Sequence, residues 1–126
     1  MTGMAYWSIF KYYDSFRHKM AFKKRPVLII GQADRNDYIV LPISRITHKE
    51  NIDSQYDYRL SKEEFPLMRL KETSYIRTHK QAVANEGDLA DVIVNFKEAY
   101  PKAFEEVIEL VRKFQTDLAD QALRIE

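Results

Sequence analysis

The first part of the chain combines a short apolar segment with a longer one that has no clear pattern. Residues 5–10 (Ala-Tyr-Trp-Ser-Ile-Phe) are rich in aromatic and β-branched side chains, which favour a β-strand. Residues 11–24 show neither helical nor strand periodicity, and they are too many for an ordinary hairpin turn. The pattern therefore predicts a first strand followed by a long functional or mobile loop.

The next segment predicts a strand that is buried on both faces. Residues 27–30 (Val-Leu-Ile-Ile) are consecutive branched aliphatic side chains, which is typical of a strand covered on two sides. Pro26 precedes them, and proline suits the start of a strand because it cannot donate to the ladder. Residues 32–37 are polar and rich in Asp and Asn, which predicts a turn. Residues 38–43 are then the antiparallel partner, with Pro42 at an edge or a bulge.

This predicted hairpin brings two polar residues together. Arg25 lies just before the buried strand, and Ser44 lies just after its partner. In an antiparallel pair the start of one strand lies beside the end of the other. We therefore expect Arg25 and Ser44 to be neighbours at one rim of the sheet.

Shorter strands are expected in the middle of the chain. Residues 55–60 alternate between an apolar face and a polar face that holds Asp57, as in a half-exposed strand. Residues 67–70 and 73–77 predict a strand pair or one interrupted strand, and residues 92–94 predict a last strand.

The last part of the chain has a helical pattern. Pro101 fits the first turn of a helix, and apolar residues follow it at steps of three and four over roughly seven turns. They are Phe104, Val107, Ile108, Val111, Phe114, Leu118, Ala122 and Ile125. The first half of the helix is expected to pack on the core. The helix is longer than a small barrel needs, so its tail is a candidate contact with a partner subunit.

Short strands that lead into a helix predict a mainly β fold of the α+β class, a small antiparallel β barrel or curled sheet with a C-terminal helix against it. With 126 residues, 45% of them hydrophobic, the chain has the size of one domain, residues 1–126. It contains no cysteine, which excludes disulfides, thiolate metal sites and a catalytic cysteine. Polar residues interrupt the apolar N-terminus, so we expect no signal or membrane segment and a cytoplasmic location.

Charge changes this picture only locally. The 20 basic and 19 acidic residues give a net charge of +1, but residues 11–25 contain six lysines and arginines against the single acid Asp14. Tyrosines and phenylalanines lie between these cations. The composition is typical of a single-stranded nucleic-acid contact, in which cations follow phosphates and rings stack on bases. A solvated loop whose aromatic side chains dock on the core is the alternative.

Several kinds of chemistry are disfavoured by what the sequence lacks. His18, His48 and His79 lie on separate predicted loops without the spacing of a metal site, so no metal or other cofactor is predicted. There is no glycine-rich phosphate loop and no G-x-S-x-G elbow, which disfavours nucleotide hydrolases and serine hydrolases.

The remaining cations and hydroxyls suit cleavage of RNA without a metal. In that reaction the ribose 2′-hydroxyl attacks the adjacent phosphorus, which requires a base, an acid and fixed cations. Histidine titrates near neutrality, and arginine binds phosphate oxygens in pairs. The candidates are Arg25, Ser44, Arg77, His79, His18 and Lys19. Plain structural roles stay open as alternatives: an ion pair for Arg25, a strand-end cap for Ser44, or a surface position for His79.

Three short segments and the terminal helix also carry a family resemblance. The segments are residues 24–30 (Lys-Arg-Pro-Val-Leu-Ile-Ile), 40–44 (Val-Leu-Pro-Ile-Ser) and 74–79 (Ser-Tyr-Ile-Arg-Thr-His). In this order they resemble the MazF/PemK family of toxin endoribonucleases from toxin–antitoxin systems, over residues 5–118. The resemblance implies an SH3-like β barrel, a homodimer, and metal-independent cleavage of single-stranded RNA that a cognate antitoxin protein blocks.

The resemblance also implies roles for individual residues. Arg25 matches an arginine with acid–base and phosphate-binding roles, and Ser44 matches a position, usually threonine, that holds the scissile phosphate. Arg77 corresponds to an arginine of the PemK branch, and His79 stands where that branch has an acid. These four are the predicted catalytic residues. The predicted substrate-binding residues are His18, Lys19, Lys24 and Lys80.

The chain departs from the family pattern in two further places. Its long loop lacks the usual glycines and Glu-Gln pair, and its C-terminal helix is longer than usual. Two other functions therefore stay open. One is a non-catalytic SH3-like barrel that binds RNA or a protein partner, and the other is a transcriptional corepressor that acts only with an antitoxin.

Overall fold

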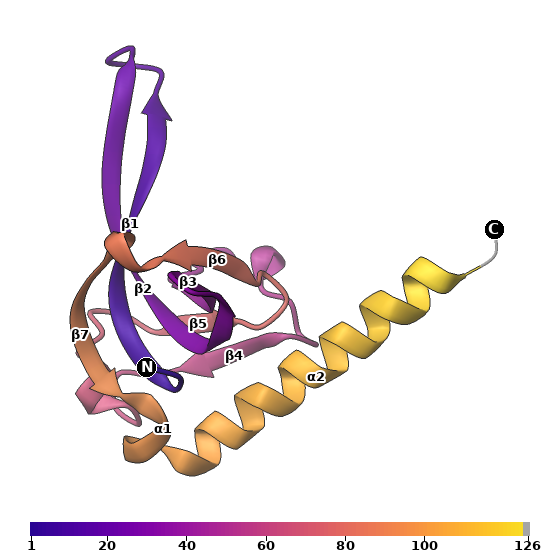
Figure 1. The fold of residues 1–126 in the computed structure, drawn as a ribbon. Coiled ribbons are helices and arrows are strands. Elements are labelled where there is room, and N and C mark those ends of the chain that lie inside the picture. The colour runs from indigo at the N-terminus through magenta and orange to yellow at the C-terminus, as the bar shows by residue number, and fades with distance from the viewer. Residues whose placement is uncertain (125–126) are drawn as a thin grey trace.

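A computed structural model describes residues 1–124, which form a curled antiparallel sheet and a long C-terminal helix (Figure 1). The strands are β1 (Met4–Asp14), β2 (Lys19–Asp34), β3 (Asp37–Ser44), β4 (Asp57–Leu60), β5 (Ser74–Arg77), β6 (Ala82–Asn85) and β7 (Leu89–Asn95). The helices are α1 (Phe96–Ala99) and α2 (Pro101–Leu123), and three short 3-10 helices cover Lys49–Asn51, Pro66–Met68 and Glu86–Asp88. The strands follow the order β4-β5-β3-β2-β1-β7, and β6 pairs with β3 beside that path. The prediction of a mainly β fold with a terminal helix is confirmed.

The inner half of β2 is buried on both faces, as its run of aliphatic residues predicts. Leu28 packs into the larger hydrophobic cluster, which also contains Phe96 and Val107. Val27 and Ile29 point to the other face and pack into a smaller cluster. All three β2 side chains are fully buried. This strand therefore lies between the two hydrophobic clusters and contributes side chains to both.

The prediction of a loop at residues 11–24 is wrong, because these residues extend the paired strands β1 and β2. β1 and β2 pair without a bulge from Ala5–Leu28 to Asp14–Lys19, and only residues 15–18 form the turn. The resulting hairpin projects from the sheet at the top of Figure 1. Apolar–polar alternation marks a strand only when one face is buried, and both faces of this hairpin are largely open to solvent. The sequence therefore lacked the expected period.

Two smaller predictions are also corrected. Pro26 lies inside β2 instead of starting it. The strand tolerates a proline there because β3 pairs with β2 only from Val27 onward, so the missing N–H of Pro26 costs no hydrogen bond to β3. Residues 67–70 form no strand. Pro66 begins a 3-10 turn there, and Arg69 ends it in the left-handed backbone region with φ 55°.

The helix α2 begins at Pro101 and runs for 23 residues, as predicted. Its first half is buried through Ala103, Phe104, Val107 and Val111. Phe114 and Asp117 still contact Tyr56, but the helix beyond them leaves the sheet (Figure 1), and Leu118 is 50% exposed. Ile125, the last position of the predicted apolar pattern, lies outside the described residues. Among residues 1–124, no helix combines the length and the apolar character needed to cross a membrane.

We predict that Phe104→Ala lowers the free energy of unfolding by about 3–5 kcal/mol, because it removes a buried ring between α2 and the sheet. The matched control is Leu118→Ala on the exposed half of the same helix, which should change it by less than about 0.5 kcal/mol. Urea unfolding of both variants measures the difference. Equal losses would show that the helix also docks through the segment around Leu118.

Candidate nucleic-acid interface

A cavity of about 610 Å³ lies where the hairpin joins the sheet. Its walls come from β1, β2, the end of β3, the start of β5 and the segment after the second 3-10 helix. We call it the cation cavity. It is lined by Trp7, Lys23, Lys24, Arg25, Pro26, Ile43, Ser44, Arg45, Met68, Arg69, Leu70, Lys71, Ser74 and Ile93.

Positive charge dominates this cavity. Six of its lining residues are lysines or arginines, and none of the described lining residues is a carboxylate. The nearest ion pair joins Arg45 Nη1 to Glu72 Oε1 at 3.7 Å, and both side chains are more than half exposed. Such a pair is screened by water and contributes little. A concave surface with several cations of one sign attracts an anionic ligand.

Arg25 and Ser44 lie together in this cavity, which confirms that they are neighbours at one rim. Val27 pairs with Pro42, so two further steps along the antiparallel strands bring Arg25 opposite Ser44. Trp7 lies beside them because it pairs with Pro26 across β1 and β2. The rim therefore combines a guanidinium, a hydroxyl and an aromatic ring.

The sequence did not reveal that Arg69 and Lys71 belong to this cavity. Their segment resembles a strand in its apolar content, but Pro66 and the left-handed residue Arg69 turn it toward β7. Arg69 Nη2 donates a hydrogen bond to the carbonyl of Ile93 at 3.1 Å, which fixes the segment against the sheet. The only available signal was the pair of cations on either side of Leu70.

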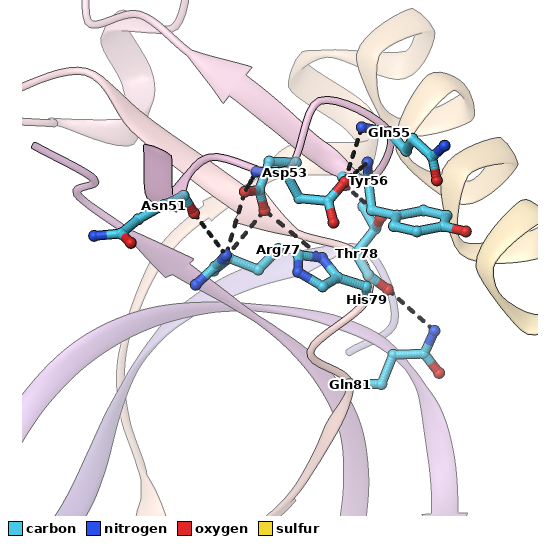
Figure 2. A network of polar contacts seen from close by, with 9 residues as sticks. Asn51, Asp53, Gln55, Tyr56, Arg77, Thr78, His79 and Gln81 are labelled. Atoms are coloured by element: carbon cyan, nitrogen blue, oxygen red, sulfur yellow. Dashed lines mark hydrogen bonds and ion pairs between the residues drawn. The ribbon is translucent and has the colours of Figure 1, made fainter. Parts of the chain in front are cut away.

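Arg77 lies outside the cation cavity, at the other end of β5. It is three residues from Ser74, or about 10 Å along the strand. Its Nε donates to Asp57 Oδ1 at 3.1 Å, and its Nη2 donates to the carbonyl of Asn51 at 3.2 Å (Figure 2). The guanidinium is thus already occupied by groups of the protein itself.

Asp57 is the centre of this second group, and its burial corrects the expectation of a polar outer face on β4. Its side chain is 0% exposed. Besides Arg77, the backbone N–H of Asp53 donates to Asp57 Oδ2 at 2.8 Å. A buried carboxylate requires such partners. An alternating strand cannot show which polar residue will be covered by the loop before it.

His79 completes what we call the Asp57 cluster, which consists of Asp57, Arg77, His79 and Tyr56. His79 Nδ1 is buried without a hydrogen-bond partner and lies 3.7 Å from Asp57 Oδ1. The ring packs against Tyr56 and Phe114, with centroid distances of 5.7 and 6.3 Å. Burial lowers the pKa of His79, although the nearby Asp57 carboxylate opposes this shift.

Tyr56 connects this cluster to the helix α2. Its hydroxyl donates to the carboxylate of Asp117, and its ring meets Phe114 edge to face at 5.2 Å. The hydrogen bond to Asp117, with burial as a smaller cause, raises the pKa of Tyr56 to about 12. This shift reflects how strongly the protonated Tyr56 hydroxyl is held as a donor to Asp117. The cluster fastens the middle of α2 to the sheet.

The predicted substrate-binding residues are also divided. Lys24 lines the cation cavity, whereas Lys80 follows the Asp57 cluster and is exposed. His18 and Lys19 lie at the hairpin tip, about 20 Å of strand from Arg25. Across residues 1–124, no three His, Cys, Asp or Glu side chains gather closely enough to hold a metal ion.

We predict that Asp57→Asn lowers the free energy of unfolding by about 3 kcal/mol, because Arg77 then loses its buried counter-charge. The control is Glu109→Gln, which breaks the exposed Arg112–Glu109 pair and should cause no resolvable loss. Urea unfolding compares the two. A loss no larger in Asp57→Asn than in the control would contradict a structural role for the cluster.

We also predict a pH dependence of stability that comes from His79. Its pKa in the folded chain lies below the ordinary value of 6.5, so the unfolded chain binds the proton more readily. The free energy of unfolding should therefore fall as the pH drops below about 6.5, and should keep its full value above it. Denaturant unfolding between about pH 5 and 8 measures this, and His79→Gln should flatten the curve. The control removes an exposed histidine: His48→Gln should cause no resolvable loss of stability, because the His48 side chain is 72% exposed.

A comparison with protein-family models finds no match to this chain, and a comparison with curated proteins finds none either. The resemblance to the MazF/PemK family therefore stays a prediction that rests on its short motifs and the terminal helix.

Proposed function

We propose that the protein is a metal-independent, sequence-specific endoribonuclease toxin of the MazF/PemK type, which binds single-stranded RNA in the cation cavity. One observation carries the proposal: six cations and an aromatic ring line a single cavity in which Arg25 and Ser44 are neighbours. Cations that follow phosphates beside a ring that stacks on bases are the usual features of a single-strand site. The family motif contributes Arg25 and Ser44 to this same place.

The cleavage step in this proposal is attack of a ribose 2′-oxygen on the adjacent phosphorus. A bond forms between the 2′-oxygen and phosphorus, the bond to the 5′-oxygen breaks, and the products are a 2′,3′-cyclic phosphate and a 5′-hydroxyl. The 2′-oxygen loses its proton to water and the 5′-oxygen gains one from water, since none of the described lining residues is a histidine or a carboxylate. The phosphorane between these states carries extra negative charge, which preorganised donors stabilise.

Arg25 and Ser44 have distinct parts in this step. The Arg25 guanidinium can donate two parallel hydrogen bonds to non-bridging phosphate oxygens, and the Ser44 hydroxyl can donate a third. The remaining cations of the cavity hold the phosphates on either side. Arg77 and His79 stay with Asp57 in this proposal, because their positions serve the fold instead of the cavity.

The family resemblance extends the proposal to fold and partners. The curled antiparallel sheet with its terminal helix supports an SH3-like barrel. The C-terminal part of α2 from Leu118 onward is exposed and offers a surface for a second copy or for a cognate antitoxin. We propose a cytoplasmic homodimer that an antitoxin neutralises.

A second candidate is a non-catalytic SH3-like barrel that binds RNA. The cavity composition favours it in one respect, since none of the described lining residues is a histidine or a carboxylate that could serve as general base. Both candidates use the same cations, but they differ in what happens to the RNA. The non-catalytic module retains intact RNA, and its affinity falls steeply with salt.

We predict that the pure protein cleaves single-stranded RNA in EDTA and leaves 2′,3′-cyclic phosphate ends, which mass spectrometry detects. Arg25→Ala should lower kcat/KM by about 100-fold or more, because a donor to the phosphorane is lost. The control is Arg35→Ala in the turn between β2 and β3, at the far end of β2 from the cavity. It should retain the wild-type rate.

Three results would reject the proposal. Cleavage that requires a metal rejects its mechanism, and equal rates for the Arg25 and Arg35 variants reject its site. Salt-sensitive binding of RNA that stays intact supports the non-catalytic candidate instead.

A further inference from the structure

The hairpin that projects from the sheet is long enough to be a binding surface of its own. We call residues 9–24 the arm (Figure 1). Its two strands pair in an unbroken register as far as Asp14 and Lys19. An isolated two-stranded ribbon has no core of its own, so its exposed side chains are available to a ligand.

The register assigns the side chains of the arm to two faces. Residues paired across an antiparallel ribbon share a face, and successive pairs alternate between faces. The pairs Tyr13–Met20 and Lys11–Phe22 lie on one face with Lys24, which pairs with Ile9. We call Lys11, Tyr13, Met20, Phe22 and Lys24 the arm face.

The arm face exposes large apolar side chains. Tyr13, Met20 and Phe22 are 59%, 55% and 63% exposed, whereas Tyr12 on the opposite face is only 37% exposed. Lys23 covers the Tyr12 ring at 4.5 Å from its centroid. Adjacent exposed apolar groups on a folded chain mark a binding surface.

This face continues directly into the cation cavity. The next pair on the same face is Trp7–Pro26, and both residues line the cavity, as does Lys24. A ligand chain that leaves the cavity past Trp7 therefore meets Lys24 and then Phe22 without crossing to another face.

The positive charge of the arm, together with its aromatic side chains, favours a nucleic acid as the ligand over an acidic protein surface. Residues 11–24 contain five lysines and arginines and one carboxylate, Asp14. That carboxylate accepts hydrogen bonds from the N–H groups of Phe16 and Arg17 at 3.0 and 3.1 Å, so it is used by the turn. Along this face Lys24 is followed by the pair Lys11–Phe22 and then by Tyr13–Met20, so cations and aromatic rings lie side by side, as they do in single-strand binding sites.

We infer that the arm face binds the same RNA strand outside the cleavage site, with bases stacked on Phe22 and Tyr13 and phosphates held by Lys24 and Lys11. This inference rests on the proposed function, because the cavity holds the first part of the strand. It predicts that contacts with the arm make a longer RNA bind more tightly than one that fills only the cavity.

The test uses 2′-O-methyl RNA pools of randomised sequence, which cannot be cleaved by 2′-hydroxyl attack. Fluorescence anisotropy compares pools of about 4 and about 12 nucleotides. The wild type should bind the longer pool at least tenfold more tightly. Phe22→Ala should lose about tenfold for the longer pool and nothing for the shorter one, and Phe22→Tyr should keep the wild-type affinity, since it retains a ring.

The matched control is Phe16→Ala at the hairpin tip. Phe16 is 93% exposed and lies outside the arm face, so its removal subtracts more exposed apolar surface from the same hairpin. It should leave both affinities unchanged. A loss equal to that of Phe22→Ala would show a general effect of apolar surface and would overturn the assignment.

Other outcomes separate this inference from the proposed function. If the short pool binds but length adds no affinity, or if Phe22→Ala keeps that gain, the arm inference falls and the proposed function stands. If neither pool binds, the proposed function is rejected, and the arm inference, which rests on it, is rejected with it. If Phe22→Ala halves the mass measured by light scattering without changing RNA affinity, the arm face is a contact between two copies, and the inference is wrong.

Discussion

The unbroken antiparallel pairing of β1 with β2 is the constraint on which the rest of the molecule depends. Its inner part runs through the core, where Leu28 and Val27 reach opposite hydrophobic clusters. Because that part cannot slip without turning every side chain to the wrong face, the outer part is held in the same register. The cation cavity forms where the inner and outer parts meet, so core packing sets the positions of Arg25 and Trp7.

Two arginines show how a counter-charge decides the role of a residue. Arg77 lies against the buried carboxylate of Asp57 and donates to the carbonyl of Asn51, so this neutralised pair fixes the loop before β4. Arg25 lies in a cavity whose described lining contains no carboxylate. The positive charge of Arg25 is therefore available to an anionic ligand. The structural cation Arg77 therefore lies at the end of β5, and the candidate functional cation Arg25 lies on β2, with β3 between the two strands.

The sequence predicts best where one physical requirement dominates. Buried runs such as residues 27–29 and the periodic first half of α2 are correctly assigned, because the hydrophobic effect selects their residues directly. The same patterns place Arg25 beside Ser44, since strand pairing follows from those runs. Arg69 joins the cavity through a left-handed turn, and Asp57 is buried by a loop. Both depend on tertiary contacts that leave no periodic signal, and the arm has none because both its faces meet water.

The arm also has two strand edges that no described strand covers. Pairing with β7 ends at Ser8, and pairing with β3 begins only at Val27, so the backbone groups beyond these points face solvent. Open edges are templates on which another copy could add a strand and start a growing sheet. Lys23 and Lys24 lie along one of these edges, and Pro26 lies between the arm and the first β3 pair. Like charge and a missing N–H both oppose such pairing. The residues that we propose attract RNA thus also oppose edge-to-edge pairing of the free protein.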